Sequence, residues 1–206
     1  MNTIGFLKQK GGAGATTLAV HLALAAAGKR RRPLLVDVDP QGSAVSWGAA
    51  REGGSPPVVS ARVEDLPSLL RSAELEGYDL VLIDTPPHSS AATAAVARLS
   101  SLAIIPARPS ALDLAALPSV LQIVETIGVP FLVVLNACPP RAREVEEARD
   151  LLGAQKIPVW SGQIGDRTAF RRAIALGQAV TEMEPKGKAS GEIQSLWKRV
   201  ASLLSR

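Results

Sequence analysis

The sequence predicts an α/β fold with a mostly parallel central sheet and helices on both of its faces. Short apolar runs rich in Val, Leu and Ile alternate with stretches that have helical periodicity. Continuous apolar runs are typical of strands buried on both faces, and helices between them supply the crossovers of a parallel sheet. The length of 206 residues fits one such unit, so we expect residues 1–206 to form a single domain.

Five apolar runs are predicted to be strands: Ile4–Leu7, Pro33–Asp39, Leu80–Pro87, Leu102–Ala107 and Pro130–Ala137. Four stretches with helical periodicity are predicted to be helices: Thr16–Ala27, Ala91–Leu99, Leu112–Ile127 and Glu144–Leu152. Gly28 is expected to end the first helix, and Arg51–Pro57 to form a loop within the domain.

The composition favours a cytoplasmic protein. Cys138 is the single cysteine, so no internal disulfide can form and a reducing compartment is expected. No apolar run reaches the roughly 18 residues that a membrane-spanning helix needs. The first ten residues lack the basic and apolar segments of a secretory signal.

The segment "KGGAGATT", Lys10–Thr17, predicts a phosphate-binding loop. It follows a predicted strand and precedes a predicted helix, as the pattern G-x-x-x-x-G-K-[ST] does in P-loop NTPases. The backbone N–H groups of such a loop and the N-terminus of the next helix bind phosphate, and the Thr16 hydroxyl would bind Mg²⁺. A glycine-rich turn without a ligand is the alternative interpretation of this segment taken by itself.

Three carboxylates lie at the predicted ends of strands. Asp37 and Asp39 belong to "DVDPQ", and Asp84 closes the apolar run of "LVLIDTPP". In an open α/β sheet the carboxyl ends of the strands face the ligand crevice, where an aspartate in the position of Asp84 holds Mg²⁺ through water. Each aspartate alone could be a helix cap or a turn residue before proline. The loop and the three acids together favour a nucleotide site.

These segments resemble the ParA/MinD family of deviant Walker ATPases, whose loop reads K-G-G-x-G-K-[ST]-T. The resemblance rests on "KGGAGATT", "DVDPQGS" and "LVLIDTPP". It extends along the chain through Pro106–Leu114, Leu135–Arg141 and Pro185–Leu196, which look like segments of the small partition ATPases. The resemblance implies a P-loop fold that binds ATP or ADP with Mg²⁺, and a homodimer that forms on ATP binding.

The resemblance also implies roles for individual residues. Lys10 would reach across the dimer to the phosphates of the partner's ATP. Asp39 would orient the attacking water, while Asp37, Asp84 and Thr16 would support the metal ion. The loop itself would consist of Gly11, Gly12, Ala13, Gly14, Ala15, Thr16 and Thr17.

A further role concerns Asn136, at the end of a predicted strand. The resemblance implies that its side chain reads the edge of the adenine. A helix or turn cap is the alternative for this residue.

Ala15 departs from the family pattern, because the family has a lysine there that contacts the β- and γ-phosphates. Charge-assisted contacts of this kind contribute roughly 1.5–3 kcal/mol each. The same charge stabilises the transition state, so we expect weakened ATP binding and almost no turnover. A degraded ATPase would lose several catalytic positions together, whereas Lys10, Thr16, Asp39 and Asp84 all remain. An engineered lysine-to-alanine change is therefore favoured over a natural pseudo-enzyme.

The C-terminal segment Arg167–Arg206 is basic, with eight Lys or Arg and three Asp or Glu in a chain whose net charge is +4. A basic surface of this kind predicts nonspecific contact with a phosphate backbone, although a solvated surface is the alternative. The candidate DNA-binding residues are Arg167, Arg171, Arg172, Lys186, Lys188, Lys198 and Arg199. The resemblance implies a nucleoid-associated protein that positions a plasmid or a large protein assembly with an adaptor that stimulates hydrolysis.

Three other function classes stay open. A MinD-like regulator of division would use the stripe Ile193, Leu196, Trp197, Val200, Leu203 and Leu204 on a membrane. Such a stripe more often packs on its own domain, so membrane binding is not expected. A metabolic P-loop enzyme is the second class, and one cysteine argues against its iron–sulfur form. A non-catalytic nucleotide-binding scaffold is the third, because of Ala15.

Overall fold

A computed structural model describes residues 1–29 and 31–205 and confirms the predicted fold class. The strands of the described residues form one parallel six-stranded sheet in the order β3-β2-β4-β1-β5-β6. Their bounds are β1 Asn2–Phe6, β2 Pro33–Asp37, β3 Val58–Ser60, β4 Leu80–Asp84, β5 Leu102–Ala107 and β6 Phe131–Leu135.

Both faces of the sheet are buried, which explains the continuous apolar runs. In β4, Leu80 and Leu82 pack into one apolar cluster, while Val81 and Ile83 pack into the other. This alternation follows from the period of two along a strand. Every residue of β2 and β4 is buried, the terminal aspartates Asp37 and Asp84 included.

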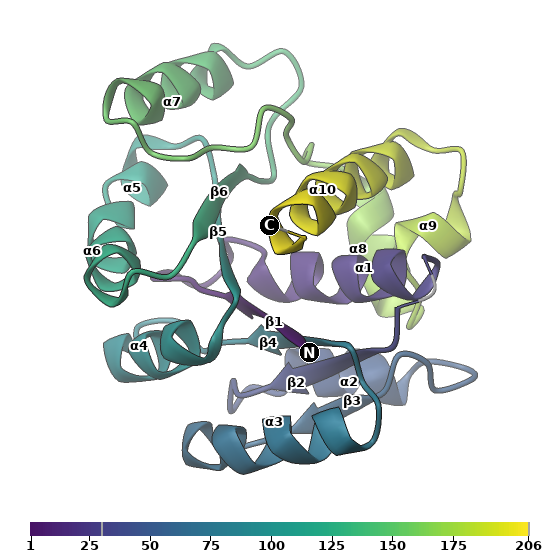
Figure 1. Cartoon of the computed structure of the whole chain (residues 1–206). Coiled ribbons are helices and arrows are strands. Elements are labelled where there is room, and N and C mark those ends of the chain that lie inside the picture. Colours follow the sequence, from purple (N-terminus) through teal and green to yellow (C-terminus); the bar gives the residue numbers. More distant parts are fainter. Residues whose placement is uncertain (30, 206) are drawn as a thin grey trace.

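Helices cover each face, as Figure 1 shows. One face carries α1 Ala15–Ala27, α2 Ser43–Ala49, α8 Thr168–Ala175, α9 Val180–Met183 and α10 Lys188–Leu204. The other carries α3 Leu66–Leu75, α4 Ser90–Leu99, α6 Leu117–Ile127 and α7 Arg143–Ala154. Two short elements, the 3₁₀ helix η1 Val63–Asp65 and the helix α5 Ala111–Leu114, lie in the connections.

The apolar stripe of the C-terminal segment packs on the domain, as predicted. Ile193, Leu196, Trp197 and Val200 of α10 are buried in the cluster that includes α1. Helices α1 and α10 lie side by side in Figure 1. No helix among the described residues combines the length and the apolarity that crossing a bilayer requires.

One predicted helix is wrong in detail, because Leu112–Ile127 is split into α5 and α6. Pro118 stands near the start of α6, and its ring cannot pack against the carbonyl four residues earlier, that of Leu114. Helix α5 accordingly ends at Leu114.

Four predicted strands are too long at their carboxyl ends. Strand β1 ends at Phe6, β2 at Asp37, β4 at Asp84 and β6 at Leu135. Asp39 therefore lies in the loop after β2, and the prolines after Asp84 lie in the loop after β4.

Candidate nucleotide site

The glycine-rich loop joins β1 to α1 and has the backbone conformation that phosphate binding requires. Gly14 is left-handed with φ 88° and caps α1 without a side-chain hydrogen bond. A Cβ at Gly14 would lie 2.1 Å from Asn136 Nδ2, so no other residue fits there. Within the described residues, no hydrogen bond is donated by a backbone N–H of residues 11–17. The loop and the helix N-terminus therefore form an anion cradle.

Two side chains hold the outer side of this loop. Asn136 Nδ2 donates to the carbonyl of Ala13 at 2.7 Å, and Arg108 Nε donates to the carbonyl of Gly12 at 2.9 Å. The carbonyl and the N–H of one peptide point in opposite directions. The N–H groups of Ala13 and Gly14 are consequently turned away from these side chains. The adenine-reading role of Asn136 stays a prediction, since here its amide positions the loop.

Three strand ends bring the predicted metal-binding groups together. Asp84 is fully buried at the end of β4, and Thr16 Oγ1 donates to its Oδ2. Asp39 Oδ1 accepts from the backbone N–H of Gln41 at 3.0 Å, which fixes the carboxylate just past the end of β2. The other oxygens, Asp39 Oδ2 and Asp84 Oδ1, each lie 3.4 Å from the ammonium of Lys8.

Asp37 has a different environment from the other two acids. Its Oδ1 accepts from the N–H of Asp39 at 3.0 Å, and its Oδ2 accepts from Ala44 and Val45 at 2.9 and 3.2 Å. It therefore caps α2, whose own N-cap Gly42 has no side chain. This geometry favours a role in orienting Asp39; contact with the metal shell stays a prediction.

Burial dominates the electrostatics of Asp84. It raises the pKa of this carboxyl group to about 6, although the Lys8 charge and the Thr16 hydrogen bond act in the opposite direction. Ionised Asp84 is therefore destabilised by its burial, and a further cation beside it would stabilise the carboxylate.

The residues present fit Mg²⁺ carried by a nucleotide. Thr16, Asp39 and Asp84 offer the hard oxygen ligands that Mg²⁺ prefers. No group of three or more His, Cys, Asp or Glu in the described part of the chain could hold a metal ion by itself. Mg²⁺ keeps several waters when it binds and takes phosphate oxygens together with one or two protein ligands.

Ala15 begins α1 and is buried, with 2% of its surface exposed. Its methyl group belongs to the apolar cluster on the α1 face of the sheet. Position 15 therefore brings no charge to the phosphate cradle.

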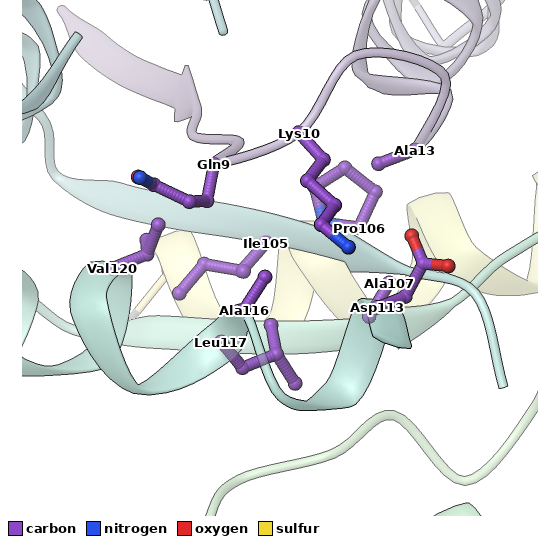
Figure 2. Close-up of a pocket in the computed structure, with 10 residues that line it drawn as sticks. All are labelled: Gln9, Lys10, Ala13, Ile105, Pro106, Ala107, Asp113, Ala116, Leu117 and Val120. Carbon is purple, nitrogen blue, oxygen red and sulfur yellow. The ribbon is translucent and has the colours of Figure 1, made fainter. Parts of the chain in front are cut away.

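Lys10 projects from the loop away from the acid cluster. Its Nζ donates to the carbonyl of Leu112 in α5 at 2.8 Å, and the side chain is partly exposed to solvent. Figure 2 shows the side chain pointing toward Asp113 of α5, with Pro106 beside it. The role across a dimer that is predicted for Lys10 stays a prediction.

A cavity of about 340 Å³ opens beside the loop. Gly12, Gly14 and Thr17 form its loop side, and Asn136, Arg167 and Phe170 are among the residues opposite. Its position next to the cradle and its mixed polar and aromatic lining suit the ribose and base of a nucleotide.

The predicted DNA-binding residues fall into two groups. Arg167 pairs with Glu192, Arg171 pairs with Asp166, and both arginines line the cavity. The others are exposed and, among the described residues, form no ion pair: Arg172, Lys186, Lys188, Lys198 and Arg199. Residue 206, the last of the basic segment, lies outside the described residues.

Sequence reasoning missed Lys8. This residue follows β1 and is 7% exposed, while its partners Asp39 and Asp84 lie 31 and 76 positions away. A polar residue directly after a buried strand was the available signal. The same signal had identified the aspartates.

The comparisons with known proteins agree with this geometry. Residues 4–180 match the family described as "CobQ/CobB/MinD/ParA nucleotide binding domain". The chain belongs to this family. One family relative is "Maintenance of carboxysome distribution protein A" of Gloeobacter kilaueensis, 40% identical over 98% of this chain and 94% of the relative. Another is the "Chromosome-partitioning ATPase Soj" of Thermus thermophilus, 40% identical over 44% of this chain and 48% of the relative.

Solved structures of the family share the fold. The cell division ATPase MinD of Pyrococcus furiosus superposes with a TM-score of 0.81 at 20% identity, over 98% of this chain and 99% of that chain. The ATP complex of a Cyanothece McdA variant superposes with a TM-score of 0.77 at 16% identity, over 100% of this chain and 96% of that chain.

Proposed function

We propose that this family member is a positioning ATPase that binds ATP and Mg²⁺, dimerises, holds DNA nonspecifically and distributes a large protein assembly with an adaptor protein. The observation that carries the proposal is the meeting of Thr16, Asp39 and Asp84 beside a cradle of unpaired N–H groups. A phosphate tail in that cradle would place its metal ion against these oxygens.

The protein assembly is favoured over a plasmid as cargo. The relative that matches nearly the whole chain is named for carboxysome distribution, whereas the Soj match covers less than half of it. DNA binding is supported by the exposed cations on α8 and α10 and by Lys186, which precedes α10. A membrane-bound MinD-like role lacks such support, because the apolar stripe of α10 is already packed.

Hydrolysis is expected to be slow in this chain. In the transition state of phosphoryl transfer, negative charge accumulates that a lysine at the position of Ala15 would stabilise. The hydrogen bond from Gln41 holds Asp39 beside the site, which supports the proposed role of this carboxylate in orienting a water molecule. Ala15→Lys should therefore raise phosphate release, and a non-catalytic scaffold would gain nothing from it.

The test combines sedimentation, a gel shift and liposome binding. Sedimentation with a non-hydrolysable ATP analogue and Mg²⁺ should show a dimer, and Lys10→Ala should bind the analogue but dimerise poorly. A gel shift should show ATP-dependent binding to DNA of any sequence. Binding to anionic liposomes in place of DNA would support the membrane-bound alternative, and absence of ATP binding would refute the proposal.

A further inference from the structure

The buried lysine after β1 is the feature of the site that the proposed function leaves unexplained. Lys8 is 7% exposed and its ammonium lies 3.4 Å from both Asp39 and Asp84. Burying an ammonium group requires paired charges, and this one is paired with two carboxylates from the ends of two other strands. Lys8 thus lies among the groups that would surround a metal ion and a terminal phosphate.

The site that contains Lys8 also lacks the positive charge expected at position 15. Position 15, where a phosphate-binding lysine would stand, is a buried alanine. The two other cations of the loop region are committed elsewhere: Lys10 donates to Leu112 and Arg108 donates to Gly12, and neither is buried. Among the described residues, Lys8 is therefore the buried cation at the base of the cradle.

We propose that Lys8 takes over the phosphate contact that Ala15 cannot make. The inference rests on the proposed function and names the residue by which this site binds the terminal phosphates. In the nucleotide-free chain, the ammonium pairs with both Asp39 and Asp84. When a nucleotide binds, Lys8 would turn from these acids to a phosphate oxygen, and Asp39 and Asp84 would be left to hold the metal ion.

The charges balance in this exchange. Two carboxylates beside one ammonium carry a net charge of −1, and all three groups are buried. A divalent ion carries twice the charge of an ammonium, so it is the better partner for the two acids. The released ammonium needs a new anion, and the phosphate tail is the one that enters with the metal ion.

The geometry allows the movement. Lys8 belongs to the same connection as the cradle, and its ammonium shares the Asp84 carboxylate with Thr16, the first-turn hydroxyl of α1. A lysine side chain has a flexible four-carbon stem and a mobile point charge, which suits a change of partner more than the rigid fork of arginine does.

The test measures nucleotide affinity, which is independent of turnover. Lys8→Met removes the ammonium but keeps most of the volume of the side chain. Loss of one charge-assisted contact should weaken ATP binding in the presence of Mg²⁺ by about 10- to 150-fold. Binding of AMP, which lacks the terminal phosphates, should stay nearly unchanged. The double variant Lys8→Met with Ala15→Lys should restore ATP affinity, because the lysine at position 15 then supplies the positive charge for the phosphates.

Two controls keep the result interpretable. Lys156→Met changes an exposed lysine after α7 and should alter neither affinity. If Lys8→Met fails to fold because two buried acids lose their counter-charge, Asp39→Asn is compared with Asp39→Asn plus Lys8→Met. The same loss of ATP affinity is expected in that pair.

The outcomes separate the role of Lys8 from the proposed function of the protein. ATP binding that survives Lys8→Met at full strength, or that becomes tighter, overturns the role of Lys8 and leaves the proposed function standing. A loss that Ala15→Lys does not restore shows that Lys8 only stabilises the acids, and also overturns it. An unaltered chain that binds no ATP refutes the proposed function and this inference together.

Discussion

Replacing Asp84 by asparagine should stabilise the nucleotide-free protein at neutral pH. The pKa of Asp84 is raised from 3.8 to about 6 by burial, so the folded state prefers the protonated acid. The unfolded state ionises this group at lower pH, and stability is therefore lost as pH rises from about 4 through about 6. At 1.36 kcal/mol for each pKa unit, the full cost above pH 6 is about 3 kcal/mol.

Asparagine can preserve the contacts that surround the acid. Its amide oxygen can accept from Lys8, and its NH₂ group can donate to the Thr16 hydroxyl, which then serves as the acceptor. Lys8 also keeps its partner Asp39. The substitution should consequently remove the cost of the charge without opening a cavity.

Urea unfolding from pH 4 to pH 8, with EDTA and without nucleotide, measures the effect. We expect Asp84→Asn to match the parent near pH 4 and to exceed it by up to about 3 kcal/mol above pH 6. Asp150→Asn, at an exposed position of α7, should follow the parent throughout. Equal stabilities of Asp84→Asn and the parent at pH 7.5, or a less stable variant, would refute the reasoning.

Three other substitutions test the loop, the C-terminal helix and the basic surface. Gly14→Ala should abolish ATP binding in an equilibrium titration, because φ is 88° and the new Cβ meets Asn136; Gly191→Ala, with open space around it, is the control. Trp197→Ala should lower the free energy of unfolding in urea by about 3–5 kcal/mol, whereas Leu75→Ala, 89% exposed, should change it little. Arg172→Glu should weaken ATP-dependent DNA binding and reduce the salt slope by about 0.9 for each phosphate that is no longer neutralised, and an unchanged slope would exclude this arginine from the interface.

The sheet was predictable because its strands are buried on both faces. All five predicted strands overlap observed ones, and all of them except Leu102–Ala107 extend past their strands into the loops that follow. The edge strand β3 has three residues, none of them buried, so it carries no continuous apolar run. Helix α2 has seven residues and depends on Asp37 for its cap, which no local pattern reveals.

The candidate site could be predicted where a local sequence pattern requires a particular residue type. Glycines 11, 12 and 14 and the carboxylate of Asp84 stand in the positions that the loop and strand patterns require. Lys8 escaped prediction because its meaning depends on carboxylates that only the folded sheet brings near it. If Lys8 supplies the charge that position 15 lacks, an engineered change at Ala15 is no longer needed to explain an otherwise intact site.

The interruption between α5 and α6 has a consequence for Lys10 of the glycine-rich loop. In a continuous helix, the N–H of Ala116 would bond to the carbonyl of Leu112. Here that N–H turns to Asp113 instead, so the Leu112 oxygen is available to Lys10. The break between α5 and α6 thus frees the backbone oxygen to which the Lys10 ammonium donates, so the sterics of one proline determine where this side chain lies.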